Sequence, residues 1–104
     1  MPVTPSTPEF PIYRAHMYRR NPKWKGQEEL YDPYIKVMHM LATARVKSGY
    51  SQSALAEELC AASSGVGRFE NGSYEPTLSW LMRYAAILGY DIEIKLKKRA
   101  KKKG

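Results

Sequence analysis

Residues 51–73 read SQSALAEELCAASSGVGRFENGS, and they contain the clearest signals of secondary structure in the chain. Ser51 is of a residue type that begins helices, because its hydroxyl can accept a hydrogen bond from one of the first free backbone N–H groups. A short helix is expected after it, with a buried face made of Leu55, Ala56 and Leu59. A turn is expected at residues 60–62, before the chain enters a second short helix.

The second short helix is expected from residue 63 to residue 70, because Asn71-Gly72-Ser73 is a strong helix breaker. Val66 and Phe69 define its inner face. The residues that must then point outward are Ser63, Ser64, Gly67 and Arg68. Such a face can approach base edges closely, and an arginine can bond to two acceptors of guanine. Two short helices joined by a tight turn fit the major groove of duplex DNA, although the same pattern also occurs in a solvent-exposed helix of any all-α domain.

Helical patterns continue on both sides of this pair. Asp32 can cap a helix that begins at Pro33 and ends at Gly49. The apolar positions of that helix are Tyr34, Met38, Leu41, Ala42 and Val46. A last helix is expected between residues 76–77 and Gly89, with the apolar positions Leu78, Leu81, Met82, Ala85 and Leu88. The fold class is therefore predicted to be all-α, with a compact domain of four to five helices at residues 32–90.

A β-strand is expected after the helices, because residues 91–97 alternate strictly between polar and apolar side chains. Its apolar face consists of Ile92, Ile94 and Leu96. A lone strand is not stable without a partner. The simplest partner is the same strand of a second chain, in a homodimer that would hold two DNA-reading helices at a fixed spacing. Pairing with residues 10–13 of the same chain is the alternative.

Residues 1–31 are expected to be extended or partly disordered. Four prolines fall within residues 1–11, and each removes a backbone donor and restricts the residue before it. Aromatic residues are scattered among basic ones over residues 13–31, so no packed core is expected there. These aromatics could still dock onto a partner or onto the main domain.

The net charge of +7 lies almost wholly at the C-terminal end of the chain, where residues 92–104 carry +6. Residues 1–32 carry five bases and four acids, and residues 33–91 carry five of each. Residues 92–104 carry seven bases against Glu93. The basic tail at residues 98–104 is thus either solvated or an arm that contacts phosphates, and the charge alone does not establish DNA binding.

Few residues indicate catalysis or metal binding. His16 and His39 have no catalytic or ligand spacing, Cys60 has no basic neighbour, and no glycine-rich phosphate loop occurs. We therefore expect no enzyme activity, no metal and no cofactor. A single cysteine, the lack of a signal peptide and the lack of an apolar run of about 20 residues predict a cytoplasmic chain outside the membrane.

From Leu41 to about Leu88 the chain resembles the Cro/cI-type (XRE) family of helix-turn-helix DNA-binding proteins. The matching stretches are residues 44–52 (ARVKSGYSQ), 55–59 (LAEEL), 68–72 (RFENG) and 76–78 (PTL). The resemblance implies a Cro/cI-like fold and a sequence-specific regulator of transcription. It implies that Gln52 contacts a phosphate, that Ser63, Ser64 and Arg68 read bases, and that Asn71 lies near further backbone contacts.

The resemblance also pairs Arg45 with Glu70 in a partly buried salt bridge, which is a structural role. Five positions depart from the family pattern, and among them Ser63 and Ser64 replace the longer, often glutamine-type, reading residues of the family. Cys60 stands where the family usually has glycine in the turn, so a left-handed conformation there would carry a Cβ penalty. Gly65 and Gly67 each cost a helix interior about 1 kcal/mol relative to alanine, so the reading helix is expected to be soft.

Residues 29–96 further resemble the HigA-type antitoxins, through residues 31–34 (YDPY) and 88–96 (LGYDIEIKL). This resemblance implies the antitoxin and autorepressor of a type II toxin–antitoxin operon, with a small RNA-cleaving toxin as partner. Residues 5–31 would then bind the toxin, as a segment that orders on its partner. The expected anchors are Phe10, Ile12, Tyr13, Tyr18, Trp24 and Tyr31. The alternatives are a phage or chromosomal repressor without a toxin partner, and a protein-interaction module on this fold.

Overall fold

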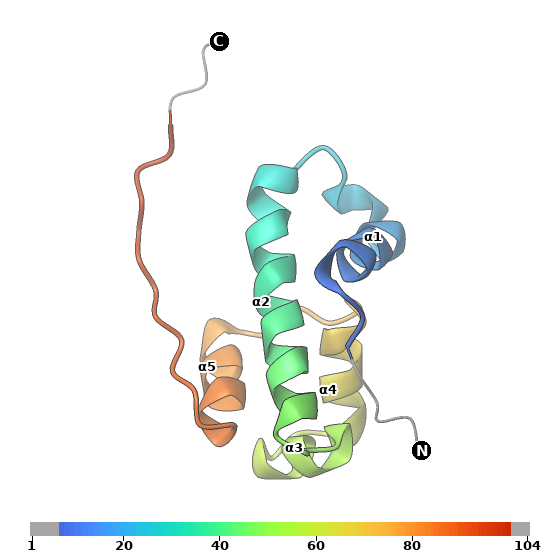
Figure 1. Cartoon of the computed structure of the whole chain (residues 1–104), viewed down its shortest axis with the longest axis vertical. Coiled ribbons are helices and arrows are strands. Elements are labelled where there is room, and N and C mark those ends of the chain that lie inside the picture. The colour runs from blue at the N-terminus through green and yellow to red at the C-terminus, as the bar shows by residue number, and fades with distance from the viewer. Residues whose placement is uncertain (1–6, 101–104) are drawn as a thin grey trace.

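The computed structural model describes residues 7–100, except for the side chain of Ser63. This part of the chain forms five α-helices and one short 3₁₀ helix (Figure 1). In chain order the elements are α1 (Phe10–Arg20), η1 (Pro22–Trp24), α2 (Glu28–Lys47), α3 (Gln52–Glu58), α4 (Ser63–Glu70) and α5 (Leu78–Ile87). The prediction of an all-α helix-turn-helix arrangement is confirmed.

Helix α2 is the axis of the fold. Helix α1 and η1 lie beside its N-terminal half, while α3, α4 and α5 surround its C-terminal half (Figure 1). Side chains from all of these elements join one apolar core. Its most completely buried large members are Tyr84, Phe69, Ile35, Met38, Leu55 and Val66. The N-terminal elements and the helix-turn-helix part therefore share a single core.

Local signals account for α3, α4 and α5. The Ser51 hydroxyl accepts a hydrogen bond from Ala54 N at 3.0 Å, and Thr77 caps α5 in the same way. Helix α4 has the predicted bounds. Gly49 follows α2 with φ +79°, a left-handed value that ends the helix without a Cβ clash.

The expectation of an extended N-terminal segment is wrong for residues 10–24, which form α1 and η1. Pro11 lies in the first turn of α1, where its missing N–H removes no helical hydrogen bond. Large side chains of these two elements are buried in the core, namely Tyr13, Met17, Tyr18 and Trp24. Tertiary packing thus stabilises a helix whose own pattern is weak. Residues 1–6 of the predicted segment lie outside the described residues.

Helix α2 begins at Glu28, before the start expected at Asp32 and Pro33. Pro33 lies inside the helix, where it gives up one backbone hydrogen bond. Asp32 caps nothing, because its carboxylate accepts hydrogen bonds from Arg14 at 2.8 and 3.2 Å and from the Tyr18 hydroxyl at 2.7 Å. These bonds to α1 hold the first turns of α2 in helical form on both sides of the proline.

The β-strand expected at residues 91–97 is not formed in the described chain. Residues 91–100 have no regular secondary structure and lead away from the body of the molecule (Figure 1). Ile92 packs on the core, whereas Ile94 is 53% exposed and Leu96 is 100% exposed. A strand needs a partner for its backbone groups, and the proposed internal partner, residues 10–13, lies in α1. Residues 101–104 of the predicted basic tail fall outside the part that the structure describes.

Candidate nucleic-acid interface

Helices α3 and α4 pack together through the buried face that their sequence predicts. Leu55 of α3 and both Val66 and Phe69 of α4 have no exposed surface. The chain turns between the helices at Cys60, which has φ +54°. This is the left-handed region, where a Cβ costs about 1 kcal/mol or more. The expected strain at this cysteine is therefore present in the turn.

The outer face of α4 is the candidate reading surface. Ser64 and Arg68 are exposed, and Gly67 is half-buried. Within residues 7–100, no hydrogen bond or ion pair engages the Arg68 guanidinium. The side chain of Ser63 lies outside the described part, so its expected outward direction stays a prediction. An exposed arginine flanked by small residues is able to reach the edge of a base pair.

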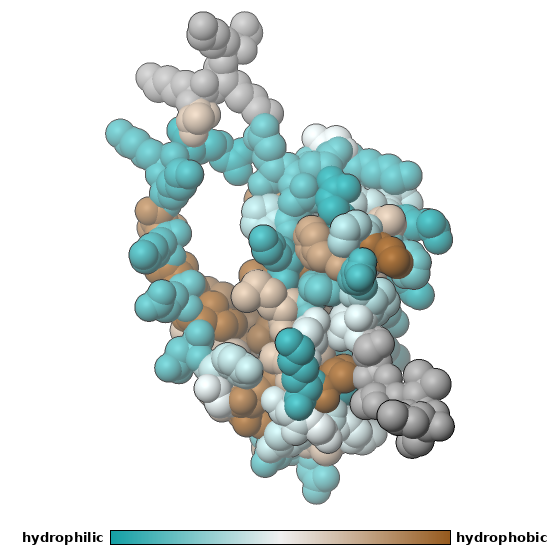
Figure 2. Space-filling model, viewed as in Figure 1, coloured by the Kyte–Doolittle hydropathy of each residue, from teal (hydrophilic) through white to brown (hydrophobic). Residues whose placement is uncertain are grey.

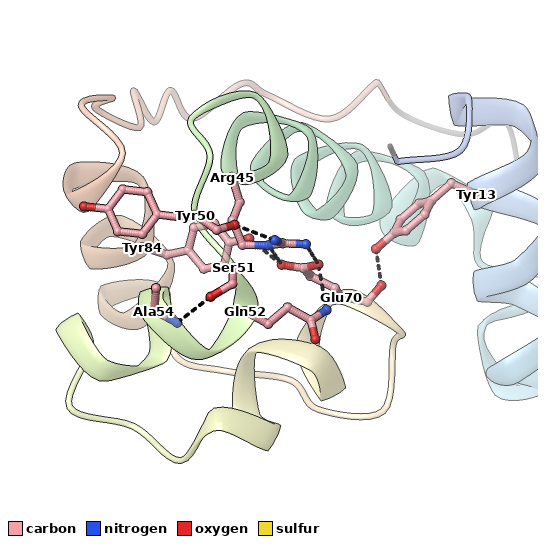
Figure 3. Close-up of polar contacts among 8 residues, drawn as sticks. All are labelled: Tyr13, Arg45, Tyr50, Ser51, Gln52, Ala54, Glu70 and Tyr84. Atoms are coloured by element: carbon pink, nitrogen blue, oxygen red, sulfur yellow. Dashed lines mark hydrogen bonds and ion pairs between the residues drawn. The ribbon is translucent and has the colours of Figure 1, made fainter. Parts of the chain in front are cut away.

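Glu70, the last residue of α4, is bound by a side chain from each of the other four α-helices (Figure 3). Its carboxylate accepts hydrogen bonds from Arg45 of α2 at 2.7 and 2.9 Å, and from Gln52 of α3 at 3.2 Å. It also accepts one from the Tyr84 hydroxyl of α5 at 2.7 Å. The backbone carbonyl of Glu70 accepts from the Tyr13 hydroxyl of α1 at 2.5 Å. The C-terminal end of α4 is thus fastened to the whole fold.

The Arg45–Glu70 ion pair is bidentate and shielded, since the two side chains are 12% and 10% exposed. Arg45 also donates to the carbonyl of Tyr50 at 2.7 Å. Hydrogen bonding to Glu70 raises the pKa of Arg45, which keeps the guanidinium charged. Burial, together with the charge of Glu70, raises the pKa of Tyr84 well above its ordinary value of 10, so its hydroxyl stays a donor. Removing one member of such a pair leaves the other charge shielded from water, which makes the pair costly to break.

Gln52 lies between Glu70 and the outer face of α4. Its Nε2 donates to Glu70, and its Oε1 lies 3.1 Å from the position that a Cβ would take on Gly67. Glycine at position 67 therefore allows the Gln52 side chain to lie against α4. Gln52 remains exposed, and its amide keeps a second N–H that can bind a phosphate oxygen.

Asn71 forms the turn that follows α4. Its Oδ1 accepts hydrogen bonds from the backbone N–H of Ser73 at 3.0 Å and from the Ser73 hydroxyl. Asn71 shares a shallow groove of about 340 Å³ with Gln52 and Gly67, and Thr7 and Pro8 line the same groove. The structure thus brings three of the predicted DNA-binding residues together, beside the segment that enters α1.

Residues 41–95 match the family model described as Helix-turn-helix (HTH_3). The match spans more than half of the chain and contains α3, the turn and α4. The chain belongs to this XRE-type helix-turn-helix family. Membership supports a role in DNA binding and in the regulation of transcription. No curated protein and no solved structure matches the chain significantly.

The part of the chain that the structure describes contains neither a membrane-spanning helix nor a cluster of metal-binding side chains. Between residues 7 and 100, none of the helices is long and apolar enough to cross a membrane. In the same part of the chain, His, Cys, Asp and Glu side chains form no group of three that could hold a metal ion. Glu70 itself is surrounded by hydrogen-bond donors rather than by other carboxylates.

The residues expected to anchor a partner protein are largely used by the helix-turn-helix protein's own core. Three of them are buried, namely Tyr13, Tyr18 and Trp24. Tyr31 stacks on Trp24 with ring centroids 4.5 Å apart, and Phe10 packs against the core. Ile12 is the exception, since 52% of it is exposed. A toxin would have to displace α1 in order to reach most of this set.

A second groove, which sequence reasoning missed, lies between α2 and the residues that follow α5. It has a volume of about 560 Å³, and its lining includes Met40, Tyr90 and Ile92. Met40 is 60% exposed and Tyr90 is 55% exposed. Hydrophobic side chains gather where the C-terminal segment leaves the body, and hydrophobic and polar residues alternate along that segment (Figure 2). Of the three predicted dimer residues, Ile92 lines this groove, while Ile94 and Leu96 lie beyond it.

Proposed function

We propose that this helix-turn-helix protein is a regulator that recognises an operator sequence in duplex DNA through the outer face of α4. One observation carries the proposal. Arg68 is exposed on the side of α4 opposite the buried Val66 and Phe69, and small residues surround it. A guanidinium placed in this way can donate two hydrogen bonds to a guanine in the major groove.

The residues around Arg68 take supporting roles in this proposal. Ser63 and Ser64 contact base edges from the first turn of α4, where their short side chains contribute little discrimination. Gln52 and Asn71 bind phosphate oxygens and so fix the register of the protein on the duplex. Gly67 adds no side chain between α4 and the DNA. Sequence preference is therefore expected to centre on Arg68.

The proposed regulator acts as a homodimer. The support is the alternation of residues 91–97 and the lack of a backbone partner for them within the described chain. Pairing of this segment with its copy would bury Ile94 and Leu96. A two-fold dimer would present two α4 helices to two half-sites of a palindromic operator.

A finer proposal is that the protein is the antitoxin and autorepressor of a type II toxin–antitoxin operon in the cytoplasm. It is favoured by the likeness of residues 31–34 and 88–96 to HigA-type antitoxins. It is also favoured by exposed apolar side chains on the N-terminal helices, since Ile12 and Leu30 are each 52% exposed. The alternative is a phage or chromosomal repressor without a toxin partner. In both proposals the chain needs no cofactor and catalyses no reaction.

The experiment is an electrophoretic mobility shift on DNA from directly upstream of the protein's own gene, at several salt concentrations. It is run with and without the protein of the neighbouring reading frame. We expect a specific shift that weakens steeply with salt, because phosphate contacts release counterions. A shift that the neighbour alters supports the antitoxin, and a shift indifferent to it supports a repressor without a toxin. Absence of a specific shift at low salt would contradict DNA reading and indicate a protein-interaction module.

A further inference from the structure

The N-terminal helix α1 supplies a hydrogen bond to the end of the DNA-reading helix. Tyr13 is 5% exposed, and its hydroxyl donates to the backbone carbonyl of Glu70 at 2.5 Å. Tyr13 and Glu70 are separated by 57 positions along the chain, so the contact joins two distant segments. Figure 3 shows the Tyr13 side chain reaching from α1 toward the backbone at Glu70.

This bond completes the C-terminal end of α4. A helix leaves its last four carbonyl groups without helical partners. In α4 the first three of these are satisfied by the turn that follows, through the N–H groups of Asn71, Ser73 and Gly72. The fourth, that of Glu70, receives the Tyr13 hydroxyl. The turn therefore closes most of the helix end, and α1 closes the rest.

A second contact joins α1 to the same turn. Gly72 has φ +86°, and a Cβ placed on it would lie 2.8 Å from Met17 Sδ and 2.9 Å from Asn21 Nδ2. The side chains of Met17 in α1 and of Asn21, which follows α1, thus lie directly against the backbone of the turn. Asn71, a proposed phosphate contact, precedes this glycine. Helix α1 holds both the end of α4 and the turn that carries Asn71.

Helix α4 needs such support from outside. Gly65 and Gly67 each disfavour the helix by about 1 kcal/mol relative to alanine. Ala62, which precedes the helix, provides no side-chain cap. Packing of Val66 against the core holds the inner face of α4, while the hydrogen bonds that join α4 to helices beyond α3 come at its Glu70 end.

We propose that Tyr13 is a positioning residue for DNA reading, which orients α4 through the Glu70 carbonyl and so sets the direction in which Arg68 meets the bases. The inference rests on the proposed DNA-binding function. Its consequence is that the N-terminal helix belongs to the DNA-reading apparatus, although it lies outside the helix-turn-helix itself. Sequence preference should then depend on Tyr13, whereas general attraction to DNA should not.

The chain contains a matched control for this claim. Tyr18 lies on the same helix, is 7% exposed, and donates its hydroxyl to Asp32 of α2 at 2.7 Å. Tyr13→Phe and Tyr18→Phe each remove one buried hydroxyl from α1 and keep the ring. They differ in that the Tyr13 hydroxyl binds α4 and the Tyr18 hydroxyl binds α2.

Affinity for the operator and for unrelated DNA is measured for the two variants and the wild-type protein, at a temperature where all are folded. We expect Tyr13→Phe to lower the ratio of specific to non-specific affinity by about two- to tenfold, the range that follows from losing one hydrogen bond. Tyr18→Phe should leave the ratio unchanged. If the two variants have the same ratio, whether unchanged or lowered, the inference is overturned, and α1 only supports the fold in general.

A second readout does not involve DNA. Hydrogen exchange at the backbone amides of Phe69 and Glu70 should be faster in Tyr13→Phe than in Tyr18→Phe, because only the first variant frees the end of α4. Equal exchange rates in the two variants would contradict the claim that the Tyr13 hydroxyl holds the end of α4. Failure of the wild-type protein to prefer any operator would instead count against the proposed function, while the exchange result would still decide whether Tyr13 holds α4.

Discussion

The two ends of α4 are held in very different ways. At its C-terminal end, side chains from four other helices converge on Glu70 and bind its carboxylate and carbonyl oxygens. At its N-terminal end, Ala62 gives no side-chain cap and Gly65 has no atom within 4 Å of the position for a Cβ. The fold thus fixes the direction of the reading helix at one end. The other end has no side-chain cap and is held by the packing of Val66 in the core.

The largest effect on stability is expected from removing the Glu70 carboxylate at the C-terminal end of α4. Glu70→Ala should lower the free energy of unfolding by about 3 kcal/mol, because it leaves the Arg45 guanidinium shielded and without its carboxylate. Chemical denaturation measures the change. Glu57→Ala, which removes an exposed carboxylate from α3, is the matched control and should change stability by less than about 0.5 kcal/mol. If the two variants unfold alike, Glu70 does not hold the helices together.

The tyrosines that bind Glu70 should make the stability of the protein fall at alkaline pH. Burial, followed by the charge of Glu70, raises the pKa of both Tyr13 and Tyr84 well above the ordinary value of 10. In the unfolded chain these tyrosines lose their protons near pH 10, while the folded protein retains them. Their contribution is therefore complete below pH 10 and is lost as the pH rises toward the folded-state values, by about 1.4 kcal/mol per pH unit for each group.

The pH dependence is isolated by comparing the wild-type protein with Tyr84→Phe. Free energies of unfolding are measured between pH 9 and pH 11.5, and the decline above pH 10 should be less steep in the variant. Parallel curves would show that Tyr84 ionises equally easily in the folded and unfolded states, contrary to its place beside Glu70.

The smallest effect on stability is expected from substitutions of the glycines in α4, Gly65 and Gly67. Gly65→Ala should raise the free energy of unfolding by about 0.5–1 kcal/mol, because a Cβ at this helical position meets no other atom. Gly67→Ala should gain less, since its Cβ would lie 3.1 Å from Gln52 Oε1 and the glutamine would have to move. Thermal unfolding of both variants checks the order. A larger gain at position 67 than at position 65 would contradict the close packing of Gln52 on α4.

The helix-turn-helix part shows which features could be predicted from the sequence and which could not. The caps at Ser51 and Thr77 act over three residues, and the buried positions of α4 recur at helical spacing. Such signals are local, so the positions of α3, α4 and α5 followed from them. The Arg45–Glu70 pair was expected through family resemblance alone. Tyr13 and Tyr84 were missed as members of the network, because nothing near them in the chain marks a tyrosine whose hydroxyl bonds to a distant helix.

The chain ends could not be predicted for a related reason. In α1, the buried Tyr13, Met17 and Tyr18 stand among basic and polar residues and next to the exposed Ile12, so the amphipathic pattern of the helix is weak. The early start of α2 depends on Asp32 binding Arg14 and Tyr18, which are 18 and 14 positions away. The segment at residues 91–97 has the pattern of a strand, but a pattern supplies no partner for the backbone groups. The errors at α1 and at the start of α2 arose because contacts with distant segments decide the structure there. The error at residues 91–97 arose because a strand also needs a partner.

Base reading by α4 is tested by comparing Arg68→Ala and Arg68→Lys with the wild-type protein in binding to the operator and to unrelated DNA of equal length. If α4 reads bases through a bidentate arginine, Arg68→Ala should abolish most of the preference for the operator, with a loss of about 1–3 kcal/mol in specific binding. Arg68→Lys should retain attraction to phosphates and recover little of the preference. A preference that survives Arg68→Ala unchanged would contradict the claim that this face of α4 reads DNA.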